Sequence, residues 1–164
     1  MTSEPTMQTL VTPEMEQKKG VWENERTSYP VSESDIRKWA LASYWPEKPP
    51  QIFYDPEYAK GTKWGGIIAP NDFNPFAWPI ERPARQEASG PRSGAGQRGM
   101  NGGQVETFGV PMRPGDVITS RTRLKDWNER ETRLGLTLFT ETEMEWRNQR
   151  GELVKTRIST GIRY

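Results

Sequence analysis

The sequence predicts an α+β fold, in which one helix precedes a run of antiparallel strands. The helix signal is residues 31–36, Val-Ser-Glu-Ser-Asp-Ile, where a capping serine is followed three positions later by an acidic residue. The strand signal is residues 134–146, where Leu, Thr, Met and Trp occupy every second position and charged residues lie between many of them. Residues 153–163 alternate again after Asn-Gln-Arg-Gly, which predicts a hairpin. This order is typical of the α+β class.

The first thirty residues carry weaker signals. We expect residues 1–12 to be a flexible tail, because they are polar and terminal. Residues 14–20 are compatible with a short helix that ends at Gly20. Residues 21–29 mix polar and aromatic side chains, which favours an irregular first strand.

The main predicted helix starts after Ser32, whose hydroxyl can cap it. Val31 and Ile36 flank this cap and can form a hydrophobic staple. The helix should end around residues 44–45, because Pro46 disfavours helical geometry in the residue before it.

A second helical turn is predicted at residues 55–60. Asp55 can cap it, Pro56 suits the first helical position, and Gly61 ends it. Asp55 is therefore better explained as a cap than as a catalytic base. Residues 64–69 follow as a tight apolar segment.

The composition changes after residue 70. Residues 73–80 form a short apolar patch that we expect to dock on the core. Residues 80–103 are rich in Pro and Gly, which predicts a loop and makes a long helix after residue 70 improbable.

The C-terminal third is predicted to be a sheet, completing one domain over residues 13–164. Its candidate strands are residues 104–110, 117–127, 134–146 and 153–163, with turns at 111–116 and 148–151.

The composition excludes several kinds of site. The chain has 23 basic and 22 acidic residues without a basic stripe, so we expect no nucleic-acid binding. It has no Cys and no His, which removes disulfides and the usual zinc ligands, and no carboxylate spacing suggests a metal site. No segment is long and apolar enough for a membrane helix or resembles a signal peptide, so a cytoplasmic location is expected.

Four segments together resemble the MaoC-like (R)-specific enoyl-CoA hydratases and dehydratases. They are the helix start at 31–36, Tyr-Asp-Pro-Glu-Tyr-Ala at 54–59, Gly-Gly-Ile-Ile-Ala-Pro at 65–70, and Arg-Pro-Gly-Asp at 113–116 with the later hairpin at 147–154. Their order covers nearly all of the chain after Glu14 and is most similar to the N-terminal, FAS1-like dehydratase domain. The resemblance implies a hot-dog fold, an antiparallel sheet around a helix. Here the prolines would shorten or break that helix.

The resemblance also locates the positions of the catalytic pair. Such enzymes use an Asp and a His five residues apart in a run Gly-Asp-x-Asn-Pro-Ile-His-x-Asp. Placed on this chain without gaps, the Asp falls on Lys48 and the His on Phe53. Phe53 cannot transfer a proton, and Lys48 has the wrong charge to replace a carboxylate. The resemblance therefore implies a non-catalytic, substrate-shaping subunit of an enoyl-CoA hydratase or 3-hydroxyacyl-CoA dehydratase.

Further expectations follow from this resemblance. The partner would be a second MaoC-like chain with the intact pair, in a heterodimer or heterotetramer, and the ligand an acyl-CoA thioester without a separate cofactor. A broken helix would leave space for a bulky or ring-containing acyl group, as in lipid or steroid metabolism. The expected substrate-binding residues are Phe53, Trp64, Gly66, Ile68, Asn71 and Phe73.

Two alternatives remain open on the sequence. The chain is also compatible with a non-catalytic module that binds acyl-CoA or an acyl carrier as a homodimer. It could instead be an enzyme with a relocated carboxylate base such as Glu47 or Asp72, although no spacing supports this. Phe53, like most buried Phe residues, could simply pack in the core.

Overall fold

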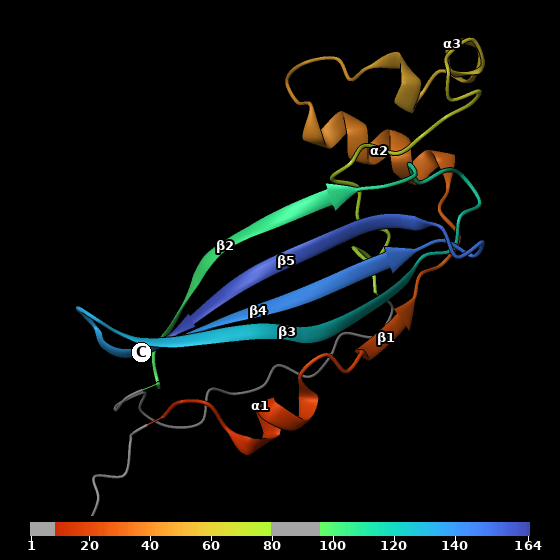
Figure 1. Ribbon diagram of the computed structural model, residues 1–164. Helices are drawn as coiled ribbons and strands as arrows, with labels where there is room; N and C mark the ends of the chain where they lie inside the picture. The colour runs from red at the N-terminus through yellow and green to blue at the C-terminus, as the bar shows by residue number, and fades with distance from the viewer. Residues whose placement is uncertain (1–8, 80–95) are drawn as a thin grey trace, which may run out of the picture.

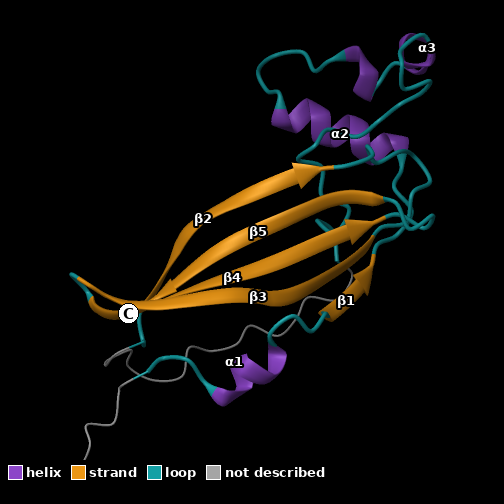
Figure 2. Cartoon of the chain, in the orientation of Figure 1, coloured by secondary structure: helices purple, strands orange, loops and turns teal. Residues whose placement is uncertain are grey.

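The computed structural model describes residues 9–79 and 96–164, and its centre is one antiparallel sheet (Figures 1 and 2). Five strands pair in the order β1-β3-β4-β5-β2. They are β1 Glu23–Thr27, β2 Gly99–Phe108, β3 Thr119–Thr132, β4 Gly135–Arg147 and β5 Leu153–Arg163. The α+β class predicted from the sequence is therefore confirmed.

The helices are short, and two of them have the N-terminal caps that the sequence predicts. The helices are α1 Pro13–Lys18, α2 Glu33–Ser43, the 3₁₀ turn η1 Gln51–Phe53 and α3 Pro56–Lys60. The Ser32 hydroxyl accepts a hydrogen bond from the backbone N–H of Asp35 at 3.0 Å, which caps α2. The Asp55 carboxylate accepts one from Tyr58 at 3.0 Å, which caps α3 and confirms a structural role for Asp55.

The helix α2 lies beyond the ends of the strands rather than along the sheet (Figure 1). Residues 71–79, where a long helix would continue, form turns and bends. The prediction of an interrupted helix is thus confirmed for residues 71–79. Most of the predicted loop at 80–103 lies outside the described residues, since the description resumes at residue 96.

Strand pairing divides the sheet into two faces. Trp146 pairs with Ser120 on β3 and with Lys155 on β5, so these three side chains share what we call the inner face. The outer face carries ion pairs between β3 and β4, for example Arg121 with Glu145 at 2.7 Å. The strand predicted at β4 is therefore confirmed, and its neighbours Glu145 and Trp146 face opposite sides of the sheet although both are buried.

Two segments contact the inner face. The ring of Phe76 lies 5.5 Å from that of Trp146, edge to face, which confirms that the apolar patch after residue 72 docks. At the other end of the sheet, the ammonium group of Lys19 lies 4.6 Å from the centre of the Trp127 ring. The backbone N–H of Leu10 also donates to Glu129. Contacts with the sheet therefore begin before residue 13, where we expected the domain to start.

Two strand boundaries differ from the sequence prediction. β2 begins at Gly99, not at residue 104, and β3 runs on to Thr132, beyond residue 127. The sequence around Gly102 predicts a loop because glycine is disfavoured in strands. A Cβ at Gly102 would come within 2.9 Å of Thr160, so the close approach of β5 explains the glycine there.

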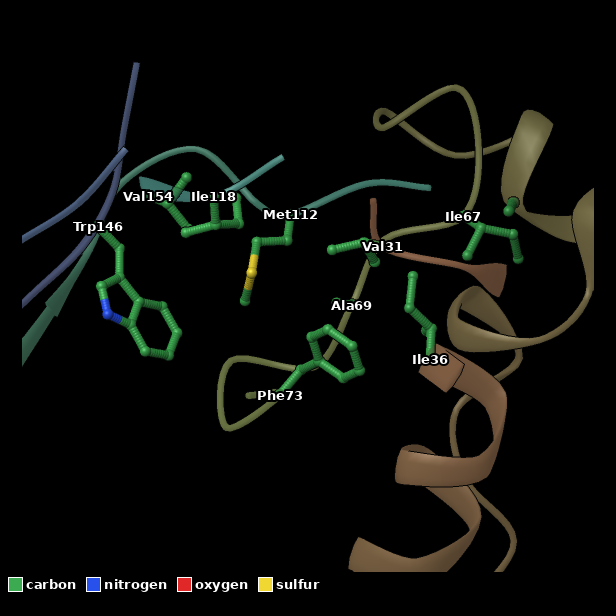
Figure 3. Packing of buried hydrophobic residues seen from close by; sticks show 10 residues of the cluster. Val31, Ile36, Ile67, Ala69, Phe73, Met112, Ile118, Trp146 and Val154 are labelled. Atoms are coloured by element: carbon green, nitrogen blue, oxygen red, sulfur yellow. The ribbon is translucent and has the colours of Figure 1, made fainter. Parts of the chain in front are cut away.

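The hydrophobic core connects the sheet to the helices (Figure 3). Trp146 and Val154 contribute from the strands, Met112 from the turn before β3, and Ile36 from α2. The segment with Ala69 and Phe73 runs between them. This core holds the turn, the 64–73 segment and the start of β5 in fixed positions.

Candidate functional site

A cavity of about 230 Å³ lies where β2 ends and β5 begins. Three stretches far apart in the sequence form its walls: residues 64–71, residues 108–112 and the start of β5. The residues that line it are Trp64, Ile68, Ala69, Pro70, Asn71, Phe108, Gly109, Val110, Pro111, Met112, Val154 and Lys155. A mostly apolar hollow with a few polar groups is the usual character of a small-molecule site.

The structure brings together three of the six residues that the sequence suggested for substrate binding. Trp64, Ile68 and Asn71 line this cavity. Phe73 is buried in the core, where its ring lies 5.6 Å from that of Trp39. Gly66 lies close to the Arg113 side chain and is not part of the cavity wall.

Lys48 and Phe53 are the two residues at which the sequence resemblance places the catalytic Asp and His. Lys48 is exposed, and its ammonium group lies 5.6 Å from the centre of the Tyr54 ring. Phe53 packs against the core, with its ring 6.0 Å from that of Tyr44. Neither residue lines the cavity beside β2. Phe53 therefore has the packing role that its residue type suggests.

Sequence reasoning missed the only cationic side chain in the cavity wall, Lys155. Its side chain is only 3% exposed. Burial lowers the pKa of Lys155, and attraction to Glu106 only partly opposes this effect. Burial would raise the pKa of Glu106, but the hydrogen bond from Arg157 and the nearby positive charges outweigh it and leave that pKa below its usual value.

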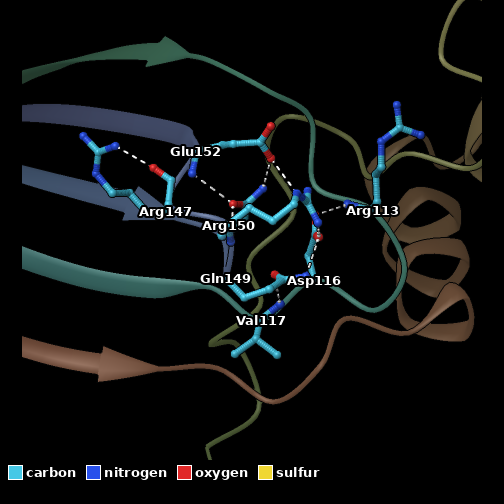
Figure 4. Close-up of polar contacts among 9 residues, drawn as sticks. Arg113, Asp116, Val117, Arg147, Gln149, Arg150 and Glu152 are labelled. Carbon is cyan, nitrogen blue, oxygen red and sulfur yellow. Dashed lines mark hydrogen bonds and ion pairs between the residues drawn. The ribbon is translucent and has the colours of Figure 1, made fainter.

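The turn that forms one wall of the cavity is held by a buried carboxylate, Asp116 (Figure 4). One of its oxygens accepts a hydrogen bond from the backbone N–H of Arg113 at 2.9 Å. The other accepts from Gln149 at 3.3 Å and from Arg150 at 3.2 Å. Asp116 therefore stabilises its own turn. The structure adds that it also ties this turn to the β4–β5 hairpin.

Residues 9–79 and 96–164 contain no group of three or more His, Cys, Asp or Glu side chains placed to hold a metal ion. No helix within these ranges has the length and apolar character needed to span a bilayer.

Comparisons with known proteins agree with this architecture. A model of the family described as FAS1-like, dehydratase domain region matches residues 17–157. No curated protein matches the chain.

Among solved structures, the ChsH1-ChsH2 complex of Mycobacterium tuberculosis contains a chain 18% identical to this one, with a TM-score of 0.66 and coverage of 92% of this chain and 93% of that one. A MaoC-like dehydratase of Rhodospirillum rubrum is 17% identical, with a TM-score of 0.58 and coverage of 86% and 90%. The HadBC (3R-hydroxyacyl-ACP dehydratase) complex of M. tuberculosis is 17% identical, with a TM-score of 0.55 and coverage of 88% and 96%.

At these identities the structural likeness establishes the fold. The family model, which spans most of the sequence, establishes the relationship. The chain therefore belongs to the FAS1-like dehydratase domain family and has the hot-dog fold of the MaoC-like dehydratases.

Proposed function

We propose that this chain is the substrate-shaping subunit of a heteromeric enoyl-CoA hydratase or 3-hydroxyacyl-CoA dehydratase. A partner chain with an intact Asp and His supplies the proton transfer. The proposal is supported by a dehydratase fold in which Lys48, exposed, and Phe53, packed on the core, stand where the sequence resemblance places the catalytic Asp and His. Phe53 has no group that can transfer a proton, and Lys48 cannot replace a carboxylate.

The free edge of the sheet supports an association with a second chain. Within the described residues β2 pairs only with β5, so its other side presents unpaired backbone groups. Val105 is 66% exposed there and Phe108 is 43% exposed. Exposed apolar edge strands are sites for strand addition from another chain. A partner strand paired with β2 would extend the sheet and cover the cavity beside Phe108.

The chemistry then divides between the two chains. In the hydration direction, the partner's base removes a proton from water, the oxygen adds to the β-carbon of the enoyl thioester, and a proton is delivered to the α-carbon. This chain contributes apolar walls, including Trp64 and Met112, that position the acyl group and exclude bulk water. The bulky or ring-containing acyl group stays a prediction: residues 71–79 form turns, but Phe73 and Phe76 of this segment pack against Trp39 and Trp146.

The proposal is tested by assaying purified chains alone and together. A MaoC-like chain with the intact pair should be co-expressed with this chain, and the loss of enoyl-thioester absorbance should be followed for each preparation. We expect a stable complex with activity and no activity from this chain alone. Turnover by the solitary chain would refute the proposal. A stable homodimer that binds acyl-CoA and does not join the partner would favour the binding module instead.

A matched pair of surface variants tests the docking edge. Val105→Lys places a charge on the exposed edge strand, whereas Leu134→Lys changes a residue of similar exposure (47%) on the β3–β4 turn, outside strand β2. Val105→Lys should weaken the complex by at least about tenfold, and Leu134→Lys should leave its affinity unchanged. Equal affinities for the two variants in a titration would place the interface elsewhere.

A further inference from the structure

The buried lysine beside the cavity has a specific electrostatic setting. The ammonium group of Lys155 lies 4.3 Å from the centre of the Trp146 ring and 5.8 Å from that of Phe108. Its Nζ is 3.5 Å from a carboxylate oxygen of Glu106. That same oxygen is only 2.6 Å from the guanidinium of Arg157. Glu106 is therefore bound mainly by Arg157, and its contact with Lys155 is long.

The ammonium group of Lys155 is therefore paired only weakly. Lys155 and Arg157 share a single carboxylate in this cluster. Asp72 also attracts Lys155, but among the described residues Glu106 is the only carboxylate close enough to form an ion pair with it. A buried cation is costly unless an anion compensates it. Among the described residues this compensation is partial, so a negatively charged ligand group would be stabilised beside Lys155.

The cavity restricts what kind of anion can approach. Apart from Asn71 and Lys155, its lining side chains are apolar or aromatic, or are glycine or proline. Its volume of about 230 Å³ corresponds to roughly eight water molecules at about 30 Å³ each. A short apolar chain that ends in a carboxylate fits these walls, since the chain would contact Ile68 and Met112 and the carboxylate would face the cation.

We infer that Lys155 recognises a carboxylate on the acyl group, so that the preferred ligand is a CoA thioester of a dicarboxylic or otherwise carboxylate-bearing acid. This inference rests on the proposed function, because it identifies the substrate class of the same site. A carboxylate that meets a poorly hydrated ammonium group in an apolar cavity forms a charge-assisted hydrogen bond, which is stronger than one between neutral groups.

The test compares two acyl chains of equal length. Adipoyl-CoA, hexanoyl-CoA and free CoA should each be titrated by calorimetry into the full chain in complex with its MaoC-like partner, with the partner alone as reference. We expect adipoyl-CoA to bind about ten- to hundredfold more tightly than hexanoyl-CoA. Lys155→Met should remove this preference by weakening adipoyl-CoA only. Lys125→Met changes a lysine on the ion-paired strand β3 that does not line the cavity and should preserve the preference.

Each other outcome has a definite meaning. Equal binding of the two thioesters by the unmodified complex would overturn the inference and leave the proposed function standing, and this comparison does not require any variant to fold. If free CoA bound tightly and Lys155→Met abolished that binding, Lys155 would bind the phosphate groups of CoA. That result would also overturn the inference. Failure of every thioester to bind the complex would refute the proposed function together with the inference.

Discussion

Replacing Asp116 with alanine tests whether one buried carboxylate holds the turn that forms a wall of the cavity. The residue is 2% exposed and lies between the Arg113–Asp116 turn and the β4–β5 hairpin (Figure 4). Backbone hydrogen bonds also tie this turn to Val31, just before α2. Three parts of the chain therefore meet at this turn.

The size of the expected loss in unfolding free energy depends on which hydrogen-bond donors lose their acceptor when the carboxylate is removed. The backbone N–H of Arg113 is part-buried and cannot easily find another acceptor once the carboxylate is gone. Leaving such a donor unsatisfied costs about 1–3 kcal/mol. Gln149 and Arg150 are exposed and can turn to water, so their loss adds only about 1 kcal/mol. We therefore expect Asp116→Ala to lower the free energy of unfolding by about 2–4 kcal/mol.

The assay is thermal unfolding followed by circular dichroism. For a chain of this size a loss of about 2–4 kcal/mol corresponds to a fall in Tm of about 4–16 °C. Asp126→Ala is the matched control, because its carboxylate pairs with Lys19 but its side chain is 58% exposed. The control should remain close to the wild type. If Asp116→Ala and Asp126→Ala unfold within about 2 °C of each other, the buried carboxylate does not hold the turn.

Two further changes probe the cavity and the sheet. Gly109→Ala should lower the free energy of unfolding by about 1–3 kcal/mol in a denaturant titration, because a Cβ there would overlap the backbone carbonyl of Leu153. The control Gly61→Ala meets only an ordinary contact and should be tolerated. Equal denaturation midpoints for the two variants would contradict the close packing at Gly109. The hydrogen bond from Arg147 holds the pKa of Glu145 below its usual 4.5 despite burial. The ionised Glu145 should therefore stabilise the fold fully above about pH 4.5, and this stabilisation should be lost as the pH falls through the folded-state pKa. The denaturation midpoint of the wild type should fall over that pH range, and Glu145→Gln should make the fall smaller.

The sequence predicted the local elements well because their causes are local. The Ser32 cap of α2 and the cap at Asp55 each depend on residues within one helical turn. The alternation of β4 requires only that one face of the strand be buried. The resemblance to the dehydratases then placed these elements in the correct fold, which composition alone would not specify.

The cavity could not be predicted in the same way, because strand pairing assembles it. Trp64, Phe108 and Lys155 are far apart in the sequence and meet only because β2 pairs with β5. In the sequence, Lys155 looks like an ordinary solvent-facing residue between Val154 and an alternating threonine. A lysine directly after the two apolar residues that start a predicted strand is a weak signal, and nothing local shows that aromatic rings cover it.

The contacts of Lys155 allow a structural role of this lysine to be distinguished from a role in ligand binding. If the lysine served stability, its removal should destabilise the chain, because a buried partner would be left without a counter-charge. Here Glu106 keeps its shorter contact with Arg157, at 2.6 Å, when Lys155 is replaced. An apolar side chain of similar length would then fill the same volume without the cost of burying a charge. Lys155→Met should therefore unfold at the same temperature as the wild type or higher, while it loses the preference for a carboxylate-bearing thioester. A variant that lost both stability and that preference would instead show that the lysine mainly supports the cavity wall.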